Sequence, residues 1–96
     1  MPGRRRCRRV GWKPVFTAFG PTGTVSPIAE EVVLSMDEFE AVRLKDFEGL
    51  DQNTCAGMME ISQPTFHRLV ISARRKIAGA LTHGKTIRIE GGDYRF

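Results

Sequence analysis

The alternation of apolar and polar positions is clearest in residues 62–85. Apolar residues recur there at spacings of three and four, which places them on one stripe of an α-helix. Ser62 can cap the start of this helix through its hydroxyl, and Gly84 can end it in the left-handed conformation. The opposite side is polar and cationic, so one face is predicted to enter a core and the other to bind a partner. The apolar stripe consists of Phe66, Leu69, Val70, Ala73, Ile77, Ala80 and Leu81.

Two shorter helices are predicted upstream of this segment. Ser35 and Glu38 match the capping box S-x-x-E, so a helix is expected over about residues 36–48, with Gly49 at its end. Asp51 can cap a second helix that reaches about residue 59, and a short turn through Glu60 and Ile61 then leads into the long helix. The side chains that the second helix is expected to bury are Cys55, Ala56, and Met58 or Met59.

Strand patterns lie on both sides of the helical region. Residues 85–90 alternate polar and apolar side chains, as in a half-buried strand. Residues 15–19 are rich in aromatic mass, which favours a short strand packed on the helices. The segment 26–34 could open with a helical turn at its Ser-Pro pair, or it could stay extended. A single strand is not stable, so residues 85–90 need a partner: residues 15–19, residues 32–34, or a second subunit.

Charge points to an acidic partner. The chain has 96 residues and a formal net charge of +4, which suits one small domain that binds nucleic acid. Residues 1–13 are the most basic segment, and we expect them to form an arm that gains order on phosphates; a solvated tail is the alternative. This segment contains Arg4, Arg5, Arg6, Arg8, Arg9 and Lys13.

Other classes of protein are disfavoured by what the sequence lacks. Its two cysteines, Cys7 and Cys55, stand in no C-x-x-C or zinc-finger spacing. No apolar run reaches the ~18 residues of a membrane span, and the basic N-terminus lacks the apolar region of a signal peptide. We therefore predict a cytoplasmic protein with no membrane partner, no cofactor, no metal site and two free thiols. No nucleophile, base and orienting group can be assigned together, so no enzyme is predicted.

Two helices, a turn of about three residues and a third helix with a cationic outer face make a helix-turn-helix. From Leu34 to Ile77 the chain resembles region four of sigma factors, particularly the extracytoplasmic-function type. One departure is Glu60, which stands where that pattern has glycine or asparagine and would be strained if its φ is positive. The matching positions are Leu34, Glu38, Glu40, Leu44, Glu48, Gly49, Leu50, Ala56, Ile61, Ser62, Thr65, Ala73, Arg74, Arg75 and Lys76.

Nearly the whole chain also resembles a small uncharacterised prokaryotic family of predicted DNA-binding proteins. The shared stretches are CRRV at residues 7–10, EEVVL to EGL at 30–50, SARRKIA-x-AL at 72–81 and IRIEGG at 87–92. The two resemblances imply a mainly α fold, with a sigma region four-like helix-turn-helix of the winged-helix-like superfamily and short strands at both ends. The expected division is a basic arm (1–13), a strand and loop region (14–34), the helix-turn-helix domain (35–84) and a C-terminal strand and tail (85–96).

The long helix would then lie in the major groove of double-stranded DNA. Arginine can pair with guanine and glutamine with adenine, whereas basic residues at the flank hold phosphates. A solvated cationic face is the alternative. The predicted base contacts are Gln63, Pro64, Thr65, His67, Arg68, Ile71 and Ser72. The predicted phosphate contacts are Arg4, Arg5, Arg6, Arg8, Arg9, Arg74, Arg75 and Lys76.

The function expected from these features is sequence-specific DNA binding in transcriptional regulation. Two alternatives remain: a protein-interaction module that contacts RNA polymerase or another regulator, and a switch that responds to thiol oxidation or metal through Cys7. Ile71 could serve as a dimer contact instead of touching a thymine methyl group. A homodimer is left open, because many helix-turn-helix proteins read palindromes as dimers.

Overall fold

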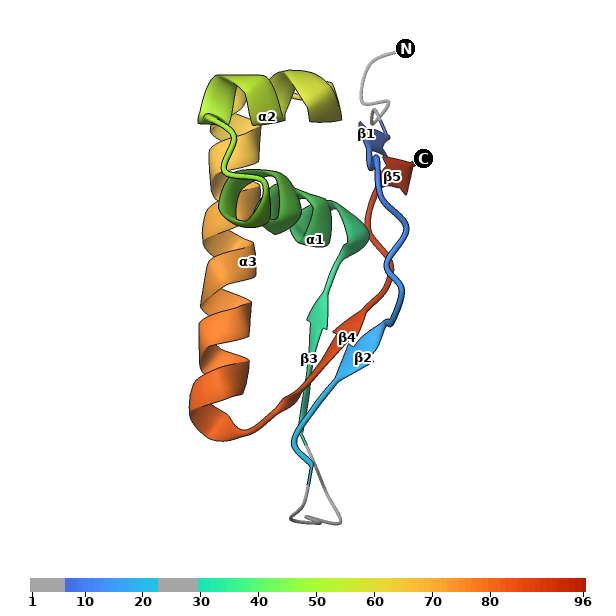
Figure 1. Cartoon of the computed structure of the whole chain (residues 1–96), viewed down its shortest axis with the longest axis vertical. Helices are drawn as coiled ribbons and strands as arrows, with labels where there is room; N and C mark the ends of the chain where they lie inside the picture. Colours follow the sequence, from blue (N-terminus) through green and yellow to red (C-terminus); the bar gives the residue numbers. More distant parts are fainter. Residues whose placement is uncertain (1–6, 23–29) are drawn as a thin grey trace.

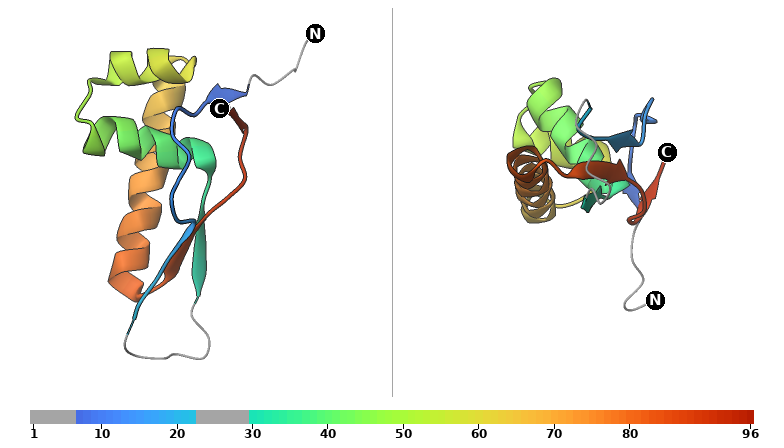
Figure 2. Two further views of the ribbon diagram at one scale, coloured as in Figure 1. Left: turned by 45° about the vertical axis from the view of Figure 1, so that its right-hand side comes forward. Right: turned by 90° about the horizontal axis from the view of Figure 1, so that it is seen from below.

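The long helix α3 is the spine of the molecule. The computed structural model describes residues 7–22 and 30–96, as short strands around a mainly helical body (Figure 1). Helix α2 lies across the N-terminal end of α3, α1 crosses its middle, and the sheet lies beside its C-terminal half (Figures 1 and 2). In chain order the elements are β1 (Arg8–Arg9), β2 (Ala18–Phe19), β3 (Glu31–Leu34), α1 (Met36–Val42), the π-helical η1 (Arg43–Phe47), α2 (Gln52–Met59), α3 (Gln63–His83), β4 (Thr86–Ile89) and β5 (Tyr94–Arg95).

Helix α3 forms as its sequence predicts. The Ser62 hydroxyl accepts from the Thr65 N–H at 3.3 Å, and Gly84 ends the helix with φ 65°. Most of the predicted apolar stripe is buried or half-buried, but Leu81 is 77% exposed. Its assignment to the core was wrong because the buried stripe reaches the end of the helix through Ala80. Leu81 lies about 100° further around the helix.

The two shorter helices begin at the predicted caps. The Ser35 hydroxyl accepts from the Glu38 N–H at 3.3 Å, and the Glu38 carboxylate accepts from the Ser35 N–H at 2.9 Å. The first helix changes after Val42 into η1, whose wider turn the sequence did not predict, and Gly49 follows with φ 75°. Asp51 accepts from the Thr54 N–H at 2.8 Å and caps α2. In α2 Met59 is buried and Met58 is 41% exposed.

The sheet ties together both ends of the helical region. Strand β4, predicted from the alternation of residues 85–90, lies between β2 and β3, so both candidate partners within the chain pair with it. β2 is antiparallel to β4 and β3 is parallel to it. Since a parallel pair needs a long crossover, α1, η1, α2 and α3 all lie in the connection from β3 to β4. The extended alternative is confirmed for residues 31–34, whereas the Ser26-Pro27 turn lies outside the described residues.

Two apolar clusters share α1 and α3. The first holds α2 against them, and the second holds the strands against them. Val42 packs on both clusters and joins them. The first cluster consists of Ala41, Leu44, Cys55, Ala56, Met59, Phe66 and Val70. The second consists of Val10, Leu34, Met36, Ala73 and Ile89.

The described parts of the two terminal segments pair with each other. Strand β1 lies in the segment that was expected to gain order on phosphates, and it pairs in parallel with β5 of the expected tail. Val10 is fully buried in the second cluster, and its N–H donates to the Arg95 carbonyl at 2.8 Å. A single apolar side chain with a place in the core therefore anchors residues 8–10, against the repulsion of the neighbouring arginines.

The aromatic segment after Val10 is exposed, contrary to prediction. Trp12 is 51% exposed, Val15 80%, Phe16 68% and Phe19 52%. The segment does meet β4, but only along one side, because β2 is the edge of the sheet. Its side chains therefore lie at the margin of the molecule and not between the sheet and the helices.

Candidate nucleic-acid interface

An exposed stripe runs along the N-terminal half of α3. Pro64, Arg68, Ile71 and Arg75 follow one another at helical spacing and all are exposed, as is His67 beside them. The opposite side of the same turns is fixed in the core by buried residues of both clusters. Because the buried side cannot rotate, the helix presents one defined exposed surface, with Arg68 and Arg75 on it. A helix of this diameter fits the ~12 Å width of a DNA major groove.

The turn between α2 and α3 fixes the angle of this surface. Only three residues, 60–62, separate the two helices. Glu60 adopts φ 59° and ψ 43°, so the residue expected to be strained does occupy the left-handed region. The half-buried Ile61 packs on the first cluster, and the Glu60 carboxylate accepts from Arg95 of β5. The turn is thus held from the core and from the terminal strands.

Polar groups at the start of α3 bond among themselves at the surface. The Gln63 side-chain amide donates from Nε2 to the side-chain oxygen Oδ1 of Asn53 in α2 at 3.1 Å. Arg68 donates to the Thr65 hydroxyl at 3.3 Å, and that hydroxyl also accepts from Ser62. These contacts orient Gln63 and Arg68 without burying them. Nothing in the sequence of α2 predicts the contact of Asn53, because its partner Gln63 lies ten residues away in the next helix.

Ser72 and Lys76 lie on the inner flank of α3, and their predicted positions on the groove side need correction. The Ser72 hydroxyl donates to Glu38 of α1. The Lys76 ammonium donates to Glu38 at 2.7 Å and to the Val33 carbonyl at 2.9 Å. The physical reason is that the Glu38 carboxylate is buried in the capping box of α1 and needs donors. Residues 72 and 76 are one helical turn apart on the flank that faces it.

This cluster keeps Glu38 ionised. Burial favours its protonated form, but hydrogen bonds from Lys76, Ser72 and the Ser35 N–H together outweigh burial and lower the pKa of the carboxyl below its ordinary 4.5. A buried charge is tolerated only with such partners. Glu38 therefore joins α1 to α3, and it also orients the helix that carries the exposed stripe.

The two arginines at the far end of the stripe differ. Arg74 donates from Nε and Nη2 to both oxygens of Asp46, at 3.0 and 2.7 Å, and this hydrogen bonding lowers the pKa of Asp46. Arg75 is exposed, and it has no carboxylate partner among the residues that the structure describes. Arg75 is thus free for a phosphate, whereas Arg74 would have to exchange Asp46 for one. No sequence pattern predicts this pair, because its members are 28 residues apart.

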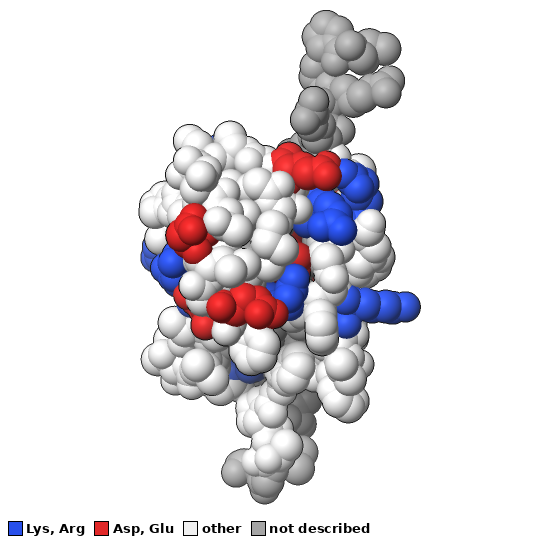
Figure 3. All heavy atoms as spheres, turned by 45° about the horizontal axis from the view of Figure 1, so that its top comes forward, with Lys and Arg blue, Asp and Glu red and all other residues white. Residues whose placement is uncertain are grey.

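The predicted phosphate contacts of the N-terminal segment lie only partly in the described residues. Arg8 is paired with Asp37 at 3.3 Å, so it serves the fold. Arg9 is exposed on β1, directly opposite Arg95 in the register with β5. Figure 3 shows Lys and Arg side chains gathered on the side of the molecule where these strands lie. Arg4, Arg5 and Arg6 lie outside the described residues.

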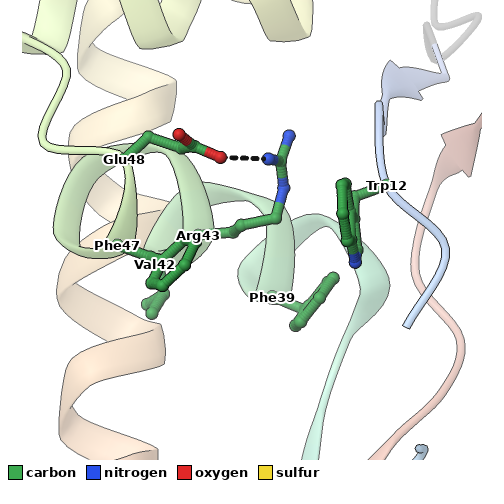
Figure 4. Close-up of a pocket in the computed structure, with 6 residues that line it drawn as sticks. All are labelled: Trp12, Phe39, Val42, Arg43, Phe47 and Glu48. Atoms are coloured by element: carbon green, nitrogen blue, oxygen red, sulfur yellow. Dashed lines mark hydrogen bonds and ion pairs between the residues drawn. The ribbon is translucent and has the colours of Figure 1, made fainter. Parts of the chain in front are cut away.

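A separate apolar slot of about 360 Å³ lies between the N-terminal segment and α1–η1 (Figure 4). Trp12, Phe39, Val42 and Phe47 line it. Arg43 borders it, with its guanidinium 5.4 Å from the centre of the Trp12 ring and 3.0 Å from Glu48. The slot does not touch the exposed stripe of α3.

The thiols and the acidic side chains do not converge. Cys7 is exposed and Cys55 is buried, and burial raises the pKa of the Cys55 thiol. Within residues 7–22 and 30–96, no group of three His, Cys, Asp or Glu side chains could hold a metal ion. In the same residues no helix is both long enough and apolar enough to cross a membrane.

Comparison with known proteins places the chain in one family. The protein-family model described as "Protein of unknown function DUF134" matches residues 1–96 of this chain. A UPF0251 protein of Thermoanaerobacter sp. (strain X514) is 52% identical over 95 residues, which cover 99% of this chain and 84% of the relative. One from Pelotomaculum thermopropionicum is 50% identical over 95 residues, covering 99% and 72%. No solved structure matches. The chain therefore belongs to the DUF134 family, together with these UPF0251 proteins.

Proposed function

We propose that this protein binds double-stranded DNA at specific sequences and regulates transcription. In this proposal α2, the turn and α3 form a helix-turn-helix, and α3 enters the major groove. The observation that carries it is the exposed stripe of α3, whose arginines could pair with a base edge or hold a phosphate, on a helix whose other face is fixed in the core. A net charge of +4 favours association with DNA.

Within this interface the residues have different roles. Gln63 and Arg68 carry side chains that pair with base edges, and they lie at the start of α3, which helix-turn-helix proteins direct to the bases. Arg75 lies about 10 Å further along the helix axis than Arg68, where the DNA backbone would pass. Ser72 and Lys76 support α3 from the inside, so they are not included among the DNA contacts.

The test is selection from a random-sequence duplex library, with sequencing of the bound fraction at two salt concentrations. Recovery of a sequence motif at both concentrations is the expected result. Binding without a motif that disappears at the higher salt would mean a nonspecific basic protein. Absence of binding at low salt would contradict the proposal outright.

Two arginine variants separate base reading from phosphate contact. Arg68→Ala should weaken the selected site by about 1–3 kcal/mol and relax the preference at one base position. Arg75→Ala should weaken all sequences nearly alike and reduce the salt dependence. Arg88→Ala is the matched control, because Arg88 is a half-exposed arginine on the sheet that pairs with Glu31. Equal, sequence-independent losses for Arg68→Ala and Arg75→Ala would rule out base reading by Arg68.

A second candidate function is supported by the apolar slot. At the edge of the slot Phe47 is 81% exposed, and Trp12 is 51% exposed. An apolar slot with exposed aromatic walls can receive an aliphatic or aromatic side chain of another protein. Such a surface could hold a side chain of RNA polymerase, which would make the protein a regulator that acts by contacting the enzyme. Pull-down of purified RNA polymerase by the wild type, but not by Phe47→Ser, would support this function, whereas equal retention by both would remove its basis.

A further inference from the structure

The two edges of the three-stranded sheet are different. At the β3 edge, the Lys76 ammonium donates to the Val33 carbonyl at 2.9 Å, and α3 packs beside this strand (Figure 1). At the β2 edge, both residues of the strand are exposed, and among the described residues no helix or strand lies outside it in Figure 1. One edge of the sheet is therefore closed within the chain and the other is open.

The open edge has backbone groups that pair with no other backbone group of the described residues. Ile89 N–H donates to the Thr17 carbonyl at 2.7 Å, so the backbone of Thr17 faces β4. Because successive residues of an antiparallel strand direct their backbone groups to opposite sides, the N–H and C=O of Ala18 face outwards. Proteins usually protect such edges with lysine, proline or a covering element. Between Pro14 and Pro21 this segment has none of them.

The side chains at the open edge are apolar and uncharged. Residues 14–22 contain no charged residue, in a chain that is 27% charged. Val15, Phe16 and Phe19 are 80%, 68% and 52% exposed, and Leu81, which lines a common groove with Phe19, is 77% exposed. Taking ~200 Å² for an aromatic side chain and less for the others, their exposed parts supply about half of the ~800 Å² that each partner buries in a standard interface.

We infer that the open β2 edge pairs with the β2 edge of a second copy of this chain, forming a two-fold symmetric dimer. An antiparallel pair of identical segments is self-complementary, because each outward N–H meets the other copy's carbonyl. At a two-fold axis a charged residue would lie near the same residue of the other copy, and the like charges would repel. An uncharged segment therefore suits pairing with a second copy of the same chain. The six residues between the two prolines match the usual length of a strand.

The test uses the full chain and measures its mass in solution over a range of concentrations. The wild type should reach twice its 10.8 kDa. Ala18→Pro removes the outward N–H and leaves the hydrogen bonds between β2 and β4 in place. Proline is tolerated on an edge strand, so the circular dichroism spectrum should be unchanged. This variant should be monomeric. Phe16→Ser tests the side-chain part and should weaken the dimer at least tenfold.

Phe47→Ser is the matched control, because Phe47 is more exposed than Phe16 but lies on η1, away from the sheet. It should leave the dimer intact. A wild type that is monomeric at every concentration overturns the inference. The inference is then overturned even if the open edge binds a peptide of another protein. A dimer that survives Ala18→Pro or Phe16→Ser, or that depends on Phe47, also overturns it.

Hydrogen exchange provides a measurement that does not depend on the variants. The Ala18 amide should be protected at dimer concentrations and exchange freely on dilution. DNA binding is a separate measurement: a monomeric variant that still recovers a half-site leaves the proposed function standing, and a dimer without DNA affinity leaves this inference standing.

Discussion

At the scale of single residues, three buried carboxylates near the start of α1 hold the fold together. Asp37, Glu38 and Glu40 are each no more than 5% exposed. Glu40 accepts from Arg43 at 2.7 Å and from the Gly11 N–H at 2.8 Å, and Glu38 accepts from Lys76. These acids therefore reach both the N-terminal segment and α3. Removing one partner of a buried pair is costly because it leaves the other charge uncompensated.

Glu38 gives a pH dependence with a definite sign. Its pKa is lower in the folded protein than its ordinary 4.5, so the unfolded chain binds the proton more tightly. The stability that Glu38 contributes is therefore full above pH 4.5 and is lost as the pH falls through the lowered folded value. Glu38→Gln, which keeps a capping-box residue type, should reduce stability at pH 7 and flatten the decline below pH 4.5 in urea titrations.

The control for this measurement is Glu90→Gln, because Glu90 is largely exposed and lies outside the cluster. It should follow the wild-type pH profile. A Glu38→Gln profile parallel to that of the wild type below pH 4.5 would mean that Glu38 does not hold its charge through Lys76 and Ser72.

At the scale of elements, the space around the glycines differs between the helices and the loop before β5. A Cβ added at Gly57 in α2 or at Gly79 in α3 would meet nothing within 4 Å. At Gly92, in the loop before β5, it would lie 2.6 Å from the Asp37 carboxylate, and Gly92 has φ 94°. The two helical glycines are thus open positions, whereas Gly92 is required for the loop to pass close to the start of α1.

Alanine substitutions should therefore have opposite signs. Gly57→Ala and Gly79→Ala should each stabilise the protein by about 0.5–1 kcal/mol, because glycine inside a helix loses more backbone entropy than alanine. Gly92→Ala should destabilise it by at least about 1 kcal/mol through its positive φ and the contact with Asp37. Denaturant midpoints at a constant slope measure all three, and a stabilising Gly92→Ala would contradict the described loop.

At the scale of the whole molecule, two clusters act as one core. α1 and α3 contribute to both, and Val42 packs on both. The sheet joins β3 to β4 at the two ends of the helical unit. The described parts of the segments 1–13, 14–34 and 85–96 pair with one another through the short strands, and they pack on the helices of segment 35–84.

One core predicts one unfolding transition. Leu44→Ala in the first cluster should cost about 2–5 kcal/mol, and Ile89→Ala in the second should cost a similar amount. Each variant should lower the same single transition in circular dichroism and in tryptophan fluorescence, which reports Trp12 beside η1. Probes that separate into two transitions for either variant would show that the clusters unfold independently.

The sequence alone was enough to predict where the helices begin and end, because these features depend on residues close together in the chain. Ser35, Asp51 and Ser62 begin their helices, and Gly84 ends α3, because caps act through backbone groups only a few residues away. The periodicity of residues 62–85 placed most of the buried face of α3 for the same reason. The alternation of residues 85–90 identified β4, although not which of its candidate partners would pair with it.

Tertiary structure alone decided what depends on contacts between distant residues. Glu38 meets Lys76 across 38 positions, and Arg74 meets Asp46 across 28; these pairs separate the free Arg75 from the engaged Arg74 and Lys76 on one cationic helix. The burial of Val10 and the exposure of Phe16 could not be predicted either. The composition of a segment does not show which of its side chains will pack against the rest of the chain. Local sequence fixes an element's ends and faces, but the position of each face depends on the packing of the whole chain.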